Sequence, residues 1–554
     1  MKSPEFQTKI QRWATPLAVL ILLAGLGLGF SSALQNSATR DEGVHLARGV
    51  AILQTGDFRL SIHHPPLMNL LSALPLFLSG RPIVFPDQDP SWRNAQKDEF
   101  AEVLAQANRN NLLFFLMLGR LPTLLLAAFL GFFVFRFSRE LFGPAAGLLS
   151  LTLYCLDPTI LAHSQLITTD LAVTAGTFFA VYALWKFHLT PTPGRLTALF
   201  VLLGLALLTK YSALLLVPLV LLLWVAAYFL DIQFGWNVFL AWEKFPRISR
   251  RDPFWTLMII LTLGLILAGL VLWAGYGFDL SPWPFSRYLR GSLTTRELLH
   301  HPSNYFRGQK SDHGFRSYYL VLFLLKTPLA TLLLLALSFL PLGARLIVAR
   351  PLSPAPAKPL SLRGLRLLPL FLFLPGLVFF LAASFLNELN IGVRYVLPAY
   401  PLLFVWIGRL LSEDKKIPRW RQLAIPVLLG WLIAASLWTW PHYLMSWNQL
   451  SGGPDQAWKI SVAGEDWGQD LPGLARYVQE HKIENLHYNV YGIGMPSLYG
   501  LRTQTFPCAT PVTGWVAVHM VDLFRPRFPG CYDWLKAYQP VAKVGWTIWI
   551  YRIE

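Results

Sequence analysis

The sequence predicts a polytopic α-helical membrane protein with about eleven transmembrane helices, interfacial helices in the first outer loop, and a small C-terminal extracytoplasmic α/β domain. Of its 554 residues, 54% are hydrophobic and 14% are charged, whereas soluble domains carry about 25% charged residues. Uncharged apolar runs of about 20 residues, the length that a helix needs to cross a bilayer, recur along most of the chain. The basic residues fall between these runs, as the determinants of membrane topology do.

The apolar runs place the predicted spans. The first run, Trp13–Leu34, is longer than the apolar part of a typical signal peptide and lacks a clear small-residue cleavage site, so we expect a retained helix. Several later runs share a short polar turn, so the number of spans has an uncertainty of about one or two. The spans are centred near residues 23, 124, 152, 178, 202, 221, 266, 331, 377, 402 and 431.

The distribution of Lys and Arg predicts the orientation. The connections between the predicted spans fall into two sets, one on each side of the membrane. One set contains only two Lys or Arg residues in its short connections, which are Asp157–Asp170, Lys210–Tyr211 and Asn387–Arg394. The other set is strongly basic and is therefore cytoplasmic, and an odd number of spans then places the C-terminal segment outside. The net charge of +17 follows from this topology, so we expect no nucleic-acid partner. The basic set contains Lys2, Lys9, Arg12, Arg136, Arg139, Lys186, Arg195, Lys244, Arg247, Arg250, Arg251, Arg345, Arg350, Lys358, Arg363, Arg366, Lys415, Lys416, Arg419 and Arg421.

Three long segments lie on the predicted outer side. The first, Gln35–Asn110, contains Glu42–Gln54 and Pro66–Leu78, which have helical apolar spacing but are too short to span, and so suit the membrane interface. The second, Gly277–Ser317, is rich in Arg, His, Gly and Ser and predicts a mobile loop. The third, Pro441–Glu554, follows the membrane part (residues 1–440) and predicts a small α/β domain. Its expected helix is Gln469–His481, and its expected strands are Leu486–Val490, Trp515–Met520 and Trp546–Tyr551.

The chain has three cysteines, too few for a thiolate metal cluster. Cys155 lies in an apolar run, whereas Cys508 and Cys531 lie in the C-terminal segment. If that segment is extracytoplasmic, these two cysteines either form a disulfide or remain two buried thiols.

Acidic residues at the outer ends of helices need an explanation, because ionisable groups near the hydrocarbon are costly and are usually paired or functional. Asp41 and Glu42 follow the first span, and Asp170 begins the fourth. Each of them alone is explained by helix capping and the helix dipole. Acidic residues that are distant in the sequence but lie on the same membrane face instead indicate a cleft in which these side chains come together.

Three cations, Lys210, Lys326 and Arg394, also lie at or near outer helix ends. A snorkelling side chain explains any one of them, but together they oppose the positive-inside trend and indicate an anionic ligand. The adjacent His63 and His64 precede an apolar helix. They could donate to a phosphate, bind a metal or cap the helix, although adjacent histidines lack the spacing of a helical metal-ligand pair.

At these positions the sequence resembles the membrane glycosyltransferases of the C superfamily, in particular the branch of the protein O-mannosyltransferases and the aminoarabinose transferase that modifies lipid A. The resemblance covers nearly the whole chain. Each shared motif is short, but their order and topology together are specific. The motifs are Asp41-Glu42, Gly56-Asp57, Pro65-Pro66-Leu67, Thr168-Thr169-Asp170-Leu171, Leu208-Thr209-Lys210-Tyr211-Ser212, Lys326-Thr327-Pro328, Asn390-Ile391-Gly392-Val393-Arg394-Tyr395 and Asp466-Trp467-Gly468-Gln469-Asp470.

The resemblance implies a bacterial inner-membrane enzyme that moves one sugar from a polyprenyl-phosphate carrier to a glycan, lipid or protein acceptor at the outer face. Asp41 and Asp170 match the two acidic loop residues of the family. Many relatives have an acidic or basic residue just before the Pro-Pro pair, where this chain has histidine, so the substrate contact there is open. The expected substrate-binding residues are His63, His64, Lys210, Tyr211, Lys326, Arg394 and Tyr395.

Sugar transfer from a lipid phosphate requires a base for the acceptor proton, and we expect Asp41 in this role, with Glu42 as the less favoured substitute. The cations would stabilise the departing phosphate. Asp170 either holds a divalent metal ion with Asp41 or orients the loop that carries Asp41. A single displacement would invert the anomeric carbon, whereas retention needs two flanking carboxylates.

The 277–317 loop is expected to close over the donor, where Arg287, Arg290 and Arg307 could assist. The main alternative is a transporter or flippase of a lipid-linked sugar, but such proteins often show repeats and charges near the midplane. A third alternative, that the chain is a structural subunit, leaves the clustered charges unexplained. Within the enzyme class, an oligosaccharide transferase is a further alternative.

Overall fold

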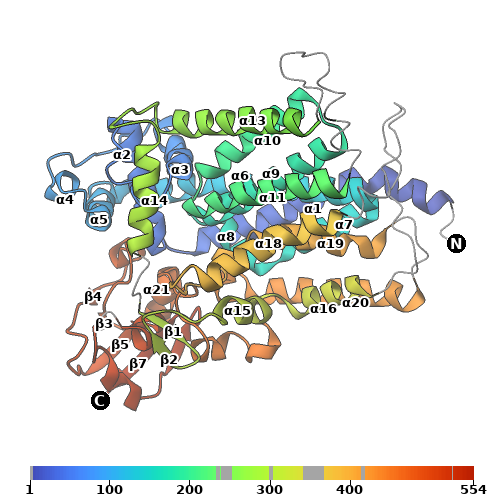
Figure 1. The fold of residues 1–554 in the computed structure, drawn as a ribbon. Coiled ribbons are helices and arrows are strands. Elements are labelled where there is room, and N and C mark those ends of the chain that lie inside the picture. Colours follow the sequence, from blue (N-terminus) through green and yellow to red (C-terminus); the bar gives the residue numbers. More distant parts are fainter. Residues whose placement is uncertain are drawn as a thin grey trace.

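A computed structural model describes residues 4–231, 238, 253–298, 303–340, 367–412, 418–526 and 528–554. All of the basic residues that were predicted to face the cytoplasm between positions 244 and 251, between 345 and 366, and at 415 and 416 lie outside these ranges, as does Lys2. Figure 1 shows helices that run roughly side by side, with the N-terminus at one end and a sheet with the C-terminus at the other.

Every predicted span centre that was named above lies in a helix. Six described helices are long and apolar enough to cross a membrane, or up to eight if each of two bent pairs is one span. The long helices are α1 (Pro4–Gln35), α6 (Leu112–Phe142), α11 (Leu216–Leu230, with the preceding turn), α13 (Pro253–Gly275), α18 (Leu368–Phe385) and α20 (Arg419–Thr439). The bent pairs are α7 (Pro144–Leu156) with α8 (Pro158–Ser164), and α15 (Tyr318–Lys326) with α16 (Leu329–Phe339).

The remaining centres lie in α9 (Asp170–Leu189), α10 (Pro193–Leu207) and α19 (Ala399–Ile407), which do not meet the same criterion. At about 1.5 Å per residue, α10 and α19 are shorter than the roughly 30 Å hydrocarbon core. The prediction of a mostly helical membrane protein is confirmed, but the number of about eleven spans is not.

Both bent pairs break at a proline, which cannot continue the backbone hydrogen bonds of a helix. Asp157 caps α8 at the first break, because its Oδ1 accepts hydrogen bonds from the Thr159 and Ile160 amides at 2.9 and 3.1 Å. At the second break, Thr327 is extended before Pro328, and α15 meets α16 at 103°. The second bend places Lys326 where two helices diverge.

The first outer segment forms α2 (Arg40–Thr55), α3 (Leu67–Leu78), α4 (Pro90–Arg93) and α5 (Lys97–Ala107). The two helices predicted there are confirmed within two residues at each end. Helix α2 packs closely on α3, since a Cβ atom on Gly49 would lie 1.9 Å from the Asn69 carbonyl oxygen.

The segment 277–317 differs from the predicted loop. It contains helix α14 (Ser286–Leu298) and an antiparallel hairpin of β1 (Asn304–Phe306) and β2 (Gln309–Ser311). The helix has few apolar residues, so its sequence lacks the apolar stripe by which surface helices are found. It packs over the loop before α3, where Thr295 Oγ1 donates to the His63 carbonyl oxygen at 3.4 Å.

The C-terminal segment contains α21 (Leu471–Glu480), α22 (Met520–Phe524) and a five-stranded sheet in the order β4-β3-β5-β7-β6. Strand β3 is parallel to β4 and β5, while β7 is antiparallel to β5 and β6. Cys508 and Cys531 form a disulfide. The predicted helix and strands are present; that this segment is a separate extracytoplasmic domain stays a prediction. The strands are β3 (Leu486–Tyr488), β4 (Thr503–Gln504), β5 (Gly514–His519), β6 (Ala542–Val544) and β7 (Ile548–Ile553).

Candidate functional site

Four of the predicted site residues form one linked cluster of charges. Lys210 Nζ donates to Asp170 Oδ1 at 2.6 Å, and Arg394 Nη1 donates to Asp41 Oδ2 at 2.8 Å. Arg394 Nη1 also lies 3.8 Å from Asp170 Oδ2 and so connects the two pairs. The Asp170 side chain is 2% exposed, whereas that of Asp41 is 39% exposed. Asp41 is therefore the carboxylate that a substrate can reach.

The cluster is assembled at the ends of short or interrupted elements. Asp41 and Asp170 lie in the first turns of α2 and α9, where the helix dipole favours a negative charge. Lys210 stands in extended backbone between α10 and the 3₁₀ turn η2 (Tyr211–Leu215). Arg394 begins the 3₁₀ turn η3 (Arg394–Val396), two residues after Gly392, whose φ is +66°.

Aromatic rings surround the two cations. Lys210 Nζ lies 4.5 Å from the centre of the Tyr395 ring, and the Arg394 guanidinium lies 4.7 Å from the centre of a Trp467 ring, distances typical of cation–π contacts. The Trp467 carbonyl oxygen also accepts a hydrogen bond from the Arg40 amide at 3.0 Å. Trp467 thereby contacts both Arg394 and the start of the helix that carries Asp41.

Glu42 faces away from this cluster, since consecutive helical residues are about 100° apart. Its two oxygens accept hydrogen bonds from Arg120 Nε and Nη2, both at 2.8 Å, and both side chains are fully buried. The amides of Thr39 and Ile167 donate to the same carboxylate at 2.9 and 3.1 Å. All of these contacts hold α2, α6 and the chain before α9 together, so the geometry gives Glu42 a structural role.

Replacing Arg120 with Met should therefore destabilise the fold by about 3–5 kcal/mol, because it leaves the Glu42 carboxylate buried and uncompensated. Arg136→Met is the matched control: Arg136 pairs with Glu140 at the surface, with a side chain that is 48% exposed, and such pairs contribute about 0–1 kcal/mol. Thermal unfolding of the two purified variants in detergent measures the difference. Equal unfolding temperatures would contradict the structural role.

Lys326 lies beside the cluster but is bonded elsewhere. Its Nζ donates to the Leu444 carbonyl oxygen at 2.7 Å and lies 3.4 Å from Glu465 Oε1. Lys326 and Arg394 nevertheless line the same small cavity, together with His163 and Trp467. The third predicted cation therefore adjoins the cluster with its charge already neutralised.

The predicted residues His63, His64 and Tyr211 lie in one region beside α2, where the centre of the His64 ring is 5.0 Å from that of His45. Tyr211 donates its hydroxyl to the Ile62 carbonyl oxygen at 2.9 Å. The Nδ1 atoms of both histidines are buried without a hydrogen-bond partner among the described residues. Burial, and next the charge of Arg48, lower the pKa of His63 to about 4, and burial holds the pKa of His64 well below its usual value. Both rings are therefore neutral at neutral pH.

The sequence reasoning missed Arg48. Its side chain is almost fully buried, and its Nε donates to the Leu60 carbonyl oxygen at 2.9 Å. No described carboxylate lies within ion-pair distance of it. Burial lowers its pKa to about 10, so it stays charged at neutral pH. The spacing of Asp41, His45 and Arg48, at i, i+4 and i+7 on one helix face, was the available signal.

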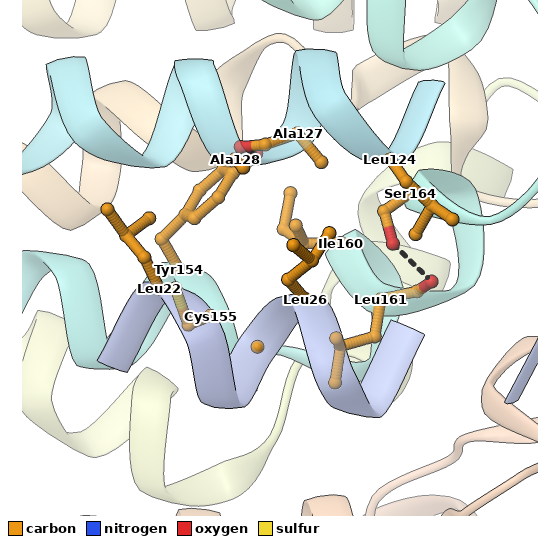
Figure 2. Close-up of a pocket in the computed structure, with 11 residues that line it drawn as sticks. Leu22, Leu26, Leu124, Ala127, Ala128, Tyr154, Cys155, Ile160, Leu161 and Ser164 are labelled. Carbon is orange, nitrogen blue, oxygen red and sulfur yellow. Dashed lines mark hydrogen bonds between the residues drawn. The ribbon is translucent and has the colours of Figure 1, made fainter. Parts of the chain in front are cut away.

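The other predicted features do not join the cluster. Arg287 pairs with Asp279, and Arg290 and Arg307 are exposed. Among the described residues, no group of three or more His, Cys, Asp or Glu side chains could hold a metal, so the metal role of Asp41 and Asp170 stays a prediction. A separate cavity, between α1, α6 and the bend of α7 and α8, is lined mainly by apolar side chains (Figure 2).

Several solved structures are similar to this chain. ArnT from Cupriavidus metallidurans bound to undecaprenyl phosphate has 13% identity and a TM-score of 0.48, covering 97% of this chain and 98% of that one. Its apo structure has 14% identity and a TM-score of 0.46 with the same coverage. An oligosaccharyltransferase from Archaeoglobus fulgidus, tethered with an acceptor peptide, has 12% identity and a TM-score of 0.40, covering 89% of this chain and 59% of that one. No curated protein matches significantly.

Residues 116–241 match the family model of the dolichyl-phosphate-mannose-protein mannosyltransferases. The matched range contains Asp170 and Lys210, which form the buried pair of the cluster. This match confirms that the chain resembles the membrane glycosyltransferases of the C superfamily, in particular the branch of the protein O-mannosyltransferases.

Proposed function

We propose that the chain is a membrane glycosyltransferase that moves a single sugar from a polyprenyl-phosphate donor to an acceptor at the outer face of the cytoplasmic membrane. The observation that carries the proposal is a partly exposed carboxylate, Asp41, bound to Arg394 beside the buried Asp170–Lys210 pair. The matched family model supports the donor class, because its description contains a sugar linked to a lipid phosphate.

In this proposal Asp41 is the general base and Glu42 is not, because both oxygens of Glu42 are occupied by Arg120 and backbone amides. Burial raises the pKa of Asp41, but the charge and hydrogen bond of Arg394 outweigh it and hold the pKa below its usual value. The negative charge of a donor phosphate bound nearby would oppose this effect of Arg394. The Asp41 pKa would then rise, so the carboxylate becomes a stronger base when the donor is bound.

Charge balance supports a position for the phosphate. The charges of Lys210 and Arg394 are balanced by Asp170 and Asp41. The buried Arg48 has no carboxylate within ion-pair distance among the described residues, and only the more distant charges of Asp98 and Asp41 act on it. An unpaired buried cation is costly and can be compensated by an anionic ligand. The proposed phosphate position is therefore beside Arg48, where His63 and His64 supply ring nitrogens without partners. There the cation would bind the charge that the phosphate carries both in the donor and in the departing product.

The proposed function is tested with membranes that contain the chain and a panel of radiolabelled polyprenyl-phosphate hexoses and pentoses. At least one donor should pass its label to a membrane acceptor, with stoichiometric release of polyprenyl phosphate. Membranes without the chain are the control. If no donor in the panel loses its sugar faster than in the control, the proposed function is wrong.

Arg48→Met should raise the KM for the donor by about tenfold or more, since a charge-assisted contact to phosphate contributes roughly 1.5–3 kcal/mol. The turnover number at saturating donor should change less. Arg93→Met, which removes an exposed arginine of the same outer segment, is the control and should leave KM unchanged. An unchanged KM in Arg48→Met would place the phosphate elsewhere.

A further inference from the structure

A groove lies between α16 and α20, which pack against each other on the side of the bundle away from α2, α3 and α14 (Figure 1). Its walls are apolar and include Ala330, Ala434 and Trp438. Trp438 is 75% exposed, and α20 is long and apolar enough to cross a membrane. The mouth of the groove therefore faces the lipid.

The groove follows from the bend at Thr327–Pro328. Because α15 meets α16 at 103°, the two helices diverge there and leave space beside α20. Helix α20 faces this space with the small Ala434 and Ala435 between the larger Trp431 and Trp438, so the alanines leave room between the two rings. Both the bend and the small residues keep the groove open toward Lys326 at its inner end.

The inner end is polar but electrically balanced. The Lys326 and Glu465 side chains are 5% and 0% exposed and lie 3.4 Å apart, so the lysine charge is neutralised in place. Trp447 also lines the groove, and its Nε1 is a buried donor without a partner among the described residues. A free neutral donor beside a paired lysine suits an uncharged headgroup that carries oxygen atoms, and does not favour a phosphate.

The groove adjoins a small cavity beside the proposed reaction site. Lys326 lines both the groove and the small cavity that reaches Arg394 and Trp467, and Arg394 holds Asp41. The unpaired Arg48 lies in α2, on the far side of the bundle from the groove (Figure 1). In a single displacement, the acceptor approaches the sugar carbon from the side opposite to the departing phosphate.

We propose that this groove binds the acyl chains of an acceptor lipid, whose uncharged, hydroxyl-bearing headgroup points past Lys326 toward Asp41. The inference rests on the proposed function. The lipid hydroxyl oxygen forms the bond to the sugar carbon and loses its proton to Asp41. The bond from that carbon to the phosphate oxygen breaks, and its electron pair leaves with the polyprenyl phosphate.

Photolabelling tests the occupant without any turnover. The full-length protein in nanodiscs is irradiated with a diacylglycerol that carries a diazirine in one acyl chain, and in parallel with a polyprenyl monophosphate that carries the same group. The diacylglycerol should label peptides of α16 and α20. Ala434→Trp fills the groove from its exposed side and should lower this labelling about tenfold. Ile433→Trp, at an exposed position of α20 that does not line the groove, should not lower it.

Two outcomes would overturn the inference. Equal labelling in both tryptophan variants would mean that the probe reports ordinary lipid around the helices. Labelling of the groove by the polyprenyl phosphate, in place of the diacylglycerol, would mean that it holds the carrier. Labelling does not depend on sugar transfer, so the two proposals can fail separately. Sugar transfer without labelling of the groove would refute this inference alone. Labelling of the groove without any sugar transfer would refute the proposed function alone.

Discussion

Asp41→Asn is expected to lower sugar transfer by about 10²–10⁴-fold, the usual contribution of a general base. Asparagine has nearly the same shape and its amide oxygen can still accept the hydrogen bond from Arg394, which spans 2.8 Å in the native chain. It cannot take the proton of an acceptor hydroxyl. The donor should therefore still bind, because Arg48 and the histidines are unchanged, while the transfer step is lost.

The measurement compares donor binding, unfolding temperature and transfer rate of Asp41→Asn with those of Asp533→Asn. Asp533 is a surface carboxylate whose side chain is 55% exposed and pairs with Lys536, so its loss should not affect transfer. Near-normal transfer by Asp41→Asn would remove Asp41 from the role of base. Loss of transfer together with loss of donor binding would instead assign Asp41 to holding the donor.

The convergence of charges was predictable because each member stands where an ionisable group is costly. Asp170, Lys210 and Arg394 lie at helix ends beside apolar runs, and side chains in such positions are usually paired or functional. Which cation pairs with which carboxylate was not predictable. The pairs are set by bends and short turns that are far apart in the sequence. Lys326 pairs with Glu465 because the bend before Pro328 turns the lysine side chain toward the C-terminal segment.

Helix geometry also directs the side chains of two adjacent residues to different partners. The sequence favours Asp41 as the base and leaves Glu42 as a less favoured substitute. The rotation of about 100° per residue separates them, because it directs Asp41 toward Arg394 and Glu42 toward Arg120. The same rotation places Arg48 on the face of Asp41. Arg48 was missed because one arginine inside an interfacial helix is ordinary, and only its burial without a carboxylate makes it a candidate for substrate binding.

Arg394→Gln is expected to lower transfer by about 10²-fold, because it removes the ion pair that holds Asp41 in place, and misplacing a catalytic group by about 1 Å can have this effect. It should also shift the pH dependence. Transfer requires the ionised form of Asp41, and Arg394 is the charge that lowers the Asp41 pKa against the effect of burial. Without Arg394, burial prevails and the pKa rises, so Asp41 is protonated at higher pH. The acidic limb of the pH–rate profile should therefore move upward in pH.

Arg394→Lys separates charge from geometry. Lysine keeps the positive charge, so the acidic limb should stay close to that of the native protein. It lacks the planar fork of arginine, and in the native chain Arg394 lies 2.8 Å from Asp41 and 3.8 Å from Asp170. Transfer should thus fall in Arg394→Lys without the shift in pH that Arg394→Gln shows. If both variants keep the native rate and the native acidic limb, Arg394 does not control Asp41, and the ion pair is structural, like that between Glu42 and Arg120.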